Sequence, residues 1–159
     1  LVPFFYSVVY PALDKIIPLT ALRKIAIGLF LTTISFVIPT WIQSQLDVGL
    51  TPHIFWQLLA YVLLTSAEVM VSITCLEFSY TQAPKTLKSF IMAFYLLSVA
   101  AGNLFTSAVN FFIQNDDGSS KLAGSDYFLF FTILMLITSL LFLFAIRHYQ
   151  EKTYIHAEK

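Results

Sequence analysis

Long apolar runs separated by short polar segments dominate the pattern of this chain. A helix that crosses a bilayer needs about 20 mostly apolar residues, and four runs reach that length after a shorter apolar stretch at the start. Prolines, glycines and charged residues mark the segments between them, which is typical of connecting loops. The pattern predicts an all-α, polytopic membrane protein. The predicted elements are a first segment at 1–13, spanning helices at 22–46, 53–83, 86–114 and 126–147, and a polar tail at 148–159.

The first segment starts within an apolar run. It begins with Leu1 and has neither the basic start nor the small-residue cleavage site of a secretory signal peptide. We therefore expect the chain to be a piece of a longer membrane protein that starts inside a helix.

The composition agrees with a membrane protein and argues against several other classes. Hydrophobic residues make up 58% of the chain and charged residues 11%, against about a quarter charged in a typical soluble domain. The net charge is zero, which gives no basis for nucleic-acid binding. Cys75 is the single cysteine and the histidines are scattered, so we expect neither an intrachain disulfide nor a metal site. We expect no enzyme activity, because no arrangement of a nucleophile with a base is visible.

Cations fall on alternate loops, and this asymmetry predicts the orientation of the chain. Eight of the nine Lys and Arg residues follow the segments 1–13, 53–83 and 126–147, and the other two loops contain only Lys121. The positive-inside rule places the cation-rich loops and the C-terminus in the cytoplasm. The eight cations are Lys15, Arg23, Lys24, Lys85, Lys88, Arg147, Lys152 and Lys159.

Glu68 lies at the midpoint of the run 53–83, near the depth at which a charge is most costly in a bilayer. Such a charge costs about 2.5–3.5 kcal/mol on insertion scales unless it faces a polar interior or pairs with another group. On an ideal α-helix, Ser72, Cys75 and Ser79 lie within about 40° of Glu68. We interpret this polar face as the lining of an interior site, with Glu68 as a functional carboxylate. A structural hydrogen bond between helices is the alternative.

Glu77 differs from Glu68 in both depth and direction. On an ideal helix it lies about half a turn round and about 14 Å farther toward the predicted cytoplasmic end. The two carboxylates therefore cannot form an acid–base pair. We interpret Glu77 as part of a structural or gate-region ion pair near the membrane interface.

The run 86–114 carries a second set of small and polar positions. Tyr95, Gly102 and Thr106 share one helical face, and Ser98 flanks it. Ser98, Gly102 and Thr106 follow one another at intervals of four residues, as in the small-residue ladders that let membrane helices approach closely. We expect this ladder to serve helix packing.

Several sequence blocks resemble one transporter family. The run AEVMVSITCLEFSYTQAPKTLKSF, followed by LLSVAAGN, is similar to the tenth and eleventh helices of the proton-coupled oligopeptide transporter family within the major facilitator superfamily. The block PLTALRKIAIG resembles the family's cytoplasmic connection between helices 8 and 9. The resemblance extends from about Pro3 to Asn103, and its most specific part is the block Glu-Phe-x-Tyr-x-x-Ala-Pro. The last helix fits the family by position.

The resemblance implies roles for individual residues. It implies that Glu68 receives the charged amino terminus of a peptide and that Ser72 lines the same cavity. Tyr95 stands where family members usually carry a tryptophan, so an aromatic wall is kept although its fit to peptide side chains differs. The resemblance also implies a cytoplasmic gate region where helices 10 and 11 meet. The residues of this gate region are Glu77, Tyr80 and Pro84.

The resemblance further implies what the whole protein binds. The chain would be the end of helix 8 and helices 9–12 of a symporter of di- and tripeptides, with the proton as coupling ion and no other cofactor. Its partners would be the peptide, protons, membrane lipid and the missing N-terminal half. The connection between the runs 22–46 and 53–83 is short, unlike that of animal family members, which favours the inner membrane of a bacterium.

Two other functions stay open at this point. The first is a transporter of the same fold that moves another small cationic or zwitterionic substrate. The second is a non-transporting membrane scaffold, in which Glu68 only pairs with a helix of a partner subunit. A motif of Glu and Arg on a first helix upstream would distinguish a symporter from a scaffold.

Overall fold

The computed structural model describes residues 3, 5–15, 20–82, 84, 86–115, 120–122 and 124–149. Within these residues the chain is helical and has no strand; one isolated bridge pairs Gln114 with Ser120. The expected all-α fold is therefore confirmed. The polar tail that we expected at 148–159 lies outside the described residues from position 150 onward.

Among the residues that the structure describes, four helices are long and apolar enough to cross a membrane. They overlap the four runs that the sequence pattern predicts, and each boundary differs by only a few residues. The spans are Ala21–Asp47, Phe55–Thr81, Lys88–Ile113 and Ser125–His148. The elements in chain order are η1 (Phe5–Val9), α2 (Tyr10–Asp14), α3 (Ala21–Asp47), α4 (Phe55–Glu68), η2 (Val69–Ile73), α5 (Thr74–Thr81), α6 (Lys88–Ile113) and α7 (Ser125–His148), where η denotes a π-helix.

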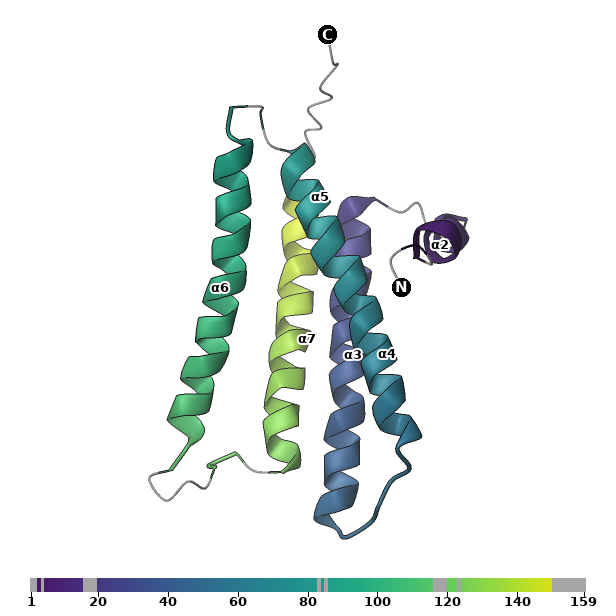
Figure 1. Ribbon diagram of the computed structural model, residues 1–159, viewed down its shortest axis with the longest axis vertical. Helices are drawn as coiled ribbons and strands as arrows, with labels where there is room; N and C mark the ends of the chain where they lie inside the picture. Colours follow the sequence, from purple (N-terminus) through teal and green to yellow (C-terminus); the bar gives the residue numbers. More distant parts are fainter. Residues whose placement is uncertain are drawn as a thin grey trace. The chain divides into compact units, whose positions relative to one another are not determined.

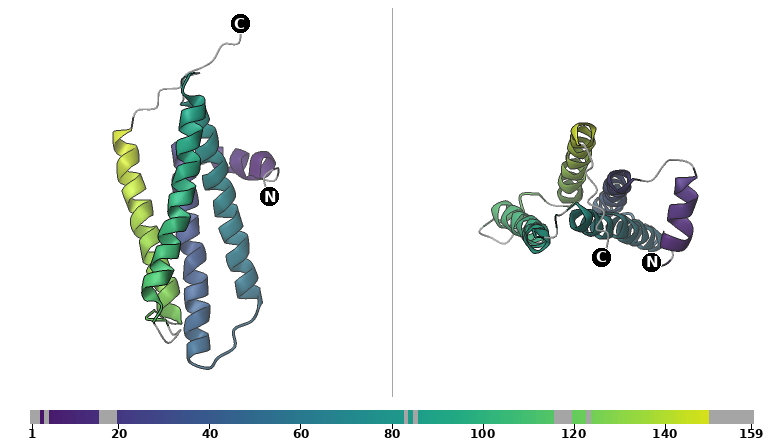
Figure 2. Two further views of the ribbon diagram at one scale, coloured as in Figure 1. Left: turned by 60° about the vertical axis from the view of Figure 1, so that its left-hand side comes forward. Right: turned by 90° about the horizontal axis from the view of Figure 1, so that it is seen from above.

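The described residues divide into two compact units, one within 1–75 and 124–149 and the other within 76–123. In the first unit α3 packs against both α4 and α7 (Figures 1 and 2). A tryptophan pair joins α3 to α4, since the Trp41 and Trp56 rings meet edge to face with centroids 5.2 Å apart. The helix α3 is therefore the central element of this unit.

Hydroxyl groups form a seam between α3 and α7. The side-chain oxygens of Thr33 and Ser139 lie 3.3 Å apart, and so do those of Thr40 and Thr132. Thr33, Ser139 and Thr132 are buried, whereas large apolar side chains such as Leu141 stay exposed on the same helices. Small hydroxylated residues inside and apolar residues outside are the expected arrangement for helices that pack in lipid.

A close approach between α3 and the second span occurs at Gly28. A Cβ atom at this position would lie 2.6 Å from Cγ2 of Val71 and 3.1 Å from Cβ of Met70. A side chain here would therefore require Val71 to shift or the two helices to move apart. The backbone oxygen of Ala67 would be only 3.3 Å away, so the contact includes main chain as well as side chains.

The second span is not a uniform α-helix. The π-helix η2 interrupts it at Val69–Ile73, directly after Glu68. A π-turn bonds residue i to i+5 and so contains about one residue more than an α-turn. The prediction of a constant advance of about 100° per residue along this span is therefore wrong across η2.

The first segment covers the π-turn. Phe5 and Tyr10 form a buried apolar cluster with Val69 and Met70 of η2. The rings of Phe5 and Tyr10 meet edge to face with centroids 5.8 Å apart. This cluster packs against one side of η2. On another side, the absence of a side chain at Gly28 allows α3 to approach η2 closely.

The second unit contains the end of α5 and the whole of α6. The Nζ atom of Lys88, in the first turn of α6, lies 3.9 Å above the centroid of the Tyr80 ring on α5. Between them the N–H of Leu87 donates to the carbonyl of Pro84 at 2.9 Å. This cation–π contact therefore bridges the turn that joins the two helices.

Candidate substrate site at the π-turn of the second span

Glu68 is the last residue of α4 and precedes the π-turn. Its side chain is exposed, while its neighbours Ala67 and Val69 are 0% and 9% exposed. The backbone at this point is thus fixed by packing, and the carboxylate projects away from the packed face. Among the described residues, no hydrogen bond or ion pair engages it. A carboxylate at this depth requires a cation, a proton or a polar cavity.

Ser72 lies inside η2 and is exposed like Glu68. A π-turn advances by a smaller angle per residue than an α-turn, so it brings Ser72 closer to the direction of Glu68 than an ideal helix would. The same change turns Cys75 away from that direction, and Cys75 is half-buried. The predicted polar face therefore keeps Glu68 and Ser72 and loses Cys75. A place for Ser79 on this face stays a prediction.

The remaining predicted site residues belong to the second unit. Tyr95 is half-buried on α6, Glu77 is exposed on α5, and Tyr80 contacts Lys88 as described above. A joint site of Tyr95 with Glu68 stays a prediction. So does an ion pair of Glu77.

The small-residue ladder on α6 is exposed. The hydroxyl of Ser98 donates to the carbonyl of Tyr95 at 2.7 Å, and that of Thr106 donates to the carbonyl of Gly102 at 3.1 Å. Both hydroxyls thus donate hydrogen bonds to carbonyls of their own helix. A helix that packs on this face of α6 would not need to supply acceptors for them. The expected packing role of the ladder stays a prediction.

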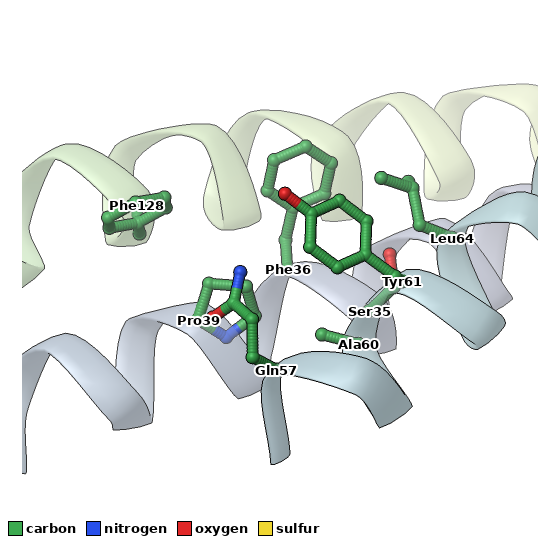
Figure 3. Close-up of a pocket in the computed structure, with 8 residues that line it drawn as sticks. All are labelled: Ser35, Phe36, Pro39, Gln57, Ala60, Tyr61, Leu64 and Phe128. Atoms are coloured by element: carbon green, nitrogen blue, oxygen red, sulfur yellow. The ribbon is translucent and has the colours of Figure 1, made fainter. Parts of the chain in front are cut away.

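A separate cavity of about 190 Å³ lies between α3, α4 and α7 (Figure 3). Pro39 has no N–H to donate to the carbonyl of Ser35. Pro39 of α3 lines the cavity together with Gln57 and Tyr61 of α4 (Figure 3). The predicted site residues do not line this cavity. Its wall consists of Ser35, Phe36, Pro39, Gln57, Ala60, Tyr61, Leu64 and Phe128.

No cluster of three or more potential metal ligands occurs among the residues that the structure describes. The chemistry available at Glu68 is that of a carboxylate, with the Ser72 hydroxyl four residues farther along the span. Such a pair can bind an ammonium group or exchange a proton.

Sequence comparison decides the family. The family described as "PTR2: POT family" matches residues 1–124 of the chain. The chain belongs to the POT family. A curated relative, Peptide transporter family 1 of Drosophila melanogaster, is 42% identical over 102 residues, covering 64% of the chain and 13% of the relative. Solute carrier family 15 member 2 of Rattus norvegicus is 47% identical over 89 residues, covering 56% of the chain and 11% of the relative.

Peptide transporter PTR2 of Saccharomyces cerevisiae is 35% identical over 123 residues, covering 69% of the chain and 20% of the relative. This POT chain thus spans a fifth or less of the curated relatives named here. All of them come from animals or yeast, so the bacterial origin expected from the short connection between α3 and α4 stays a prediction.

Solved structures agree with this assignment. A structure described as an auto-inhibited POT family peptide transporter superposes with a TM-score of 0.87 at 31% identity, covering 99% of the chain and 32% of its own length. The POT family transporter PepTSo superposes with a TM-score of 0.82 at 37% identity, covering 94% of the chain and 31% of its own length. The fold of this part of a major facilitator superfamily transporter is therefore established.

The sequence reasoning missed Gly28, the π-turn and the hydroxyl seam. The spacing of the residues in the sequence indicates the hydroxyl seam. Thr33 and Thr40 are seven residues apart, and so are Thr132 and Ser139. Seven residues make about two turns of an α-helix, so each pair shares a face. Two antiparallel helices with the same spacing can align both pairs at once.

Proposed function

We propose that this chain forms the C-terminal part of a proton-driven transporter of di- and tripeptides. Membership of the POT family supports peptide transport. The observation that carries the finer proposal is the exposed carboxylate of Glu68 beside a π-turn in the middle of a membrane span. Interrupted helices near the bilayer midplane are where secondary transporters bind their substrates.

Glu68 binds the ammonium group of the peptide in its ionised form. A charge-assisted hydrogen bond between ammonium and carboxylate is strong in a site that excludes water, and the Ser72 hydroxyl adds a second polar contact. Protonation of Glu68 removes the negative charge and so releases the ammonium group. For symport the proton must enter with the peptide on another group of the transporter and reach Glu68 only on the cytoplasmic side. Its transfer to Glu68 there couples proton entry to release of the peptide amine.

Other residues shape the site and its access. Tyr95 provides an aromatic wall for peptide side chains. Glu77, Tyr80 and Pro84 belong to the cytoplasmic gate, where the contact between Tyr80 and Lys88 fixes the turn between α5 and α6. The other half of the site comes from the N-terminal half of the transporter, and the C-terminus lies in the cytoplasm.

Peptide uptake tests this function. The full-length transporter in proteoliposomes should accumulate labelled dialanine under an inward proton gradient. Unlabelled dialanine should compete with it, whereas N-acetyl-dialanine, which lacks the ammonium group, should compete weakly. Absence of accumulation would reject peptide symport. Equal competition by the two compounds would reject amine recognition by a carboxylate.

A further inference from the structure

Two arginines from distant parts of the chain line one groove between α3 and α7. Arg23 lies in the first turn of α3, and Arg147 lies in the last turn of α7. Both line a cavity of about 450 Å³ whose other walls are apolar. These walls are formed by Ala26, Leu140, Leu143, Phe144 and Ile146.

Within the first unit, apolar side chains that line this groove are exposed. Leu140 is 53% exposed and Phe144 is 66% exposed. Their side chains run along α7 away from Arg147 toward the middle of the span, since they precede it by one to two turns. The groove thus has a cationic end at the membrane surface and an apolar length within the bilayer.

The helix dipoles act in opposite ways on the two arginines. A cation in the first turn opposes the positive end of the helix dipole, and the first turn of α3 contains no acidic residue. Arg147, in the last turn of α7, agrees with its dipole.

We propose that this groove binds an anionic phospholipid, with the headgroup phosphate between Arg23 and Arg147 and an acyl chain along Leu140 and Phe144. Charge complementarity supports this occupant, because guanidinium groups bind phosphate through paired hydrogen bonds. Basic pockets between membrane helices at the cytoplasmic surface suit anionic headgroups. The alternative is that both arginines serve only to orient the chain by the positive-inside rule.

Lipid binding to the full-length transporter separates these two accounts. Native mass spectrometry would compare retention of phosphatidylglycerol and phosphatidylcholine by wild type, Arg23→Gln/Arg147→Gln and Lys24→Gln. Lys24 is the matched control, since it neighbours Arg23 but lines a different cavity and stacks 4.4 Å from the Tyr10 ring. We expect each arginine to contribute about a fivefold preference for the anionic lipid, so the double variant should lose most of the preference and Lys24→Gln should keep it.

Two results would overturn the proposal. One is an unchanged preference in the double variant, and the other is an equal loss in Lys24→Gln, which would indicate surface charge alone. If the double variant does not fold, Arg23→Lys/Arg147→Lys keeps the charge but loses paired hydrogen bonding, and it should show an intermediate preference.

A second measurement locates the lipid. A tryptophan introduced as Leu143→Trp should be quenched more strongly by brominated phosphatidylglycerol than by brominated phosphatidylcholine. Quenching by neither lipid would show that another helix of the transporter covers the groove. Equal quenching by both would show a lipid-facing surface without headgroup selection. Either result would reject the site.

Discussion

The carboxylate of Asp47, the last residue of α3, accepts a hydrogen bond from the backbone N–H of Ser125, the first residue of α7, at 3.1 Å. Gln43 donates to the other carboxylate oxygen at 3.0 Å and so orients the group. The residue before Ser125 is Gly124, with φ at 62°, and a Cβ there would lie 2.6 Å from the Asp47 carboxylate. Asp47 therefore caps a helix to which it does not belong.

Asp47→Ala should lower the melting temperature of the detergent-solubilised transporter modestly. The change leaves the Ser125 N–H without its acceptor and removes a negative charge from the N-terminal end of α7. Asp126→Ala is the control, because this exposed residue lies in the same turn of α7. An equal effect of both substitutions would indicate a general charge effect and contradict specific capping.

Gly28→Ala should destabilise the protein by about 1–3 kcal/mol, as overpacked positions do. The added methyl group would lie 2.6 Å from Cγ2 of Val71, which is closer than van der Waals contact. Gly28→Ala combined with Val71→Ala should recover part of the loss. Thermal unfolding in detergent measures both variants, and a harmless Gly28→Ala would show that the close approach of α3 to η2 does not exist.

The contact between the hydroxyl groups of Thr33 and Ser139 should contribute little to the free energy of unfolding, although both residues are buried. Each hydroxyl has one proton, and each also lies within bonding distance of a carbonyl on its own helix, that of Leu29 or Met135. A double-mutant cycle with Thr33→Val and Ser139→Ala should therefore give a coupling of about 0.6 kcal/mol or less. Thr138→Val, which alters an exposed neighbour, serves as the control. A coupling several times larger would contradict this assignment of the protons.

The contact between Lys88 and Tyr80 should depend on the ring and not on the hydroxyl. Tyr80→Phe should leave the turn between α5 and α6 as ordered as in wild type, and Tyr80→Leu should loosen it, since an exposed cation–π contact is worth about 0.5–1 kcal/mol. Hydrogen exchange of the backbone N–H groups around Leu87 measures this order. Equal exchange in Tyr80→Phe and Tyr80→Leu would contradict a role for the ring.

The sequence was sufficient to predict the spans and the all-α fold, because long apolar runs have few alternatives in a bilayer. It was insufficient at η2, where a local departure from α-helix geometry depends on tertiary contacts with Gly28 and the first segment. The heptad spacing of Thr33 with Thr40 was visible, but the helix that faces them was not. Glu68 stood out because a charge within an apolar run is costly wherever it lies.

The most direct test of the central proposal is uptake of labelled dialanine by the full-length transporter carrying Glu68→Gln. Wild type should concentrate the peptide under an inward proton gradient. The amide keeps the size of the side chain but has neither its negative charge nor its proton chemistry, so the variant should lose most of this accumulation. Asp126→Asn, which removes an exposed carboxylate outside the proposed site and gate, provides the control and should retain activity. Undiminished, proton-driven accumulation by Glu68→Gln would contradict the role proposed for this carboxylate.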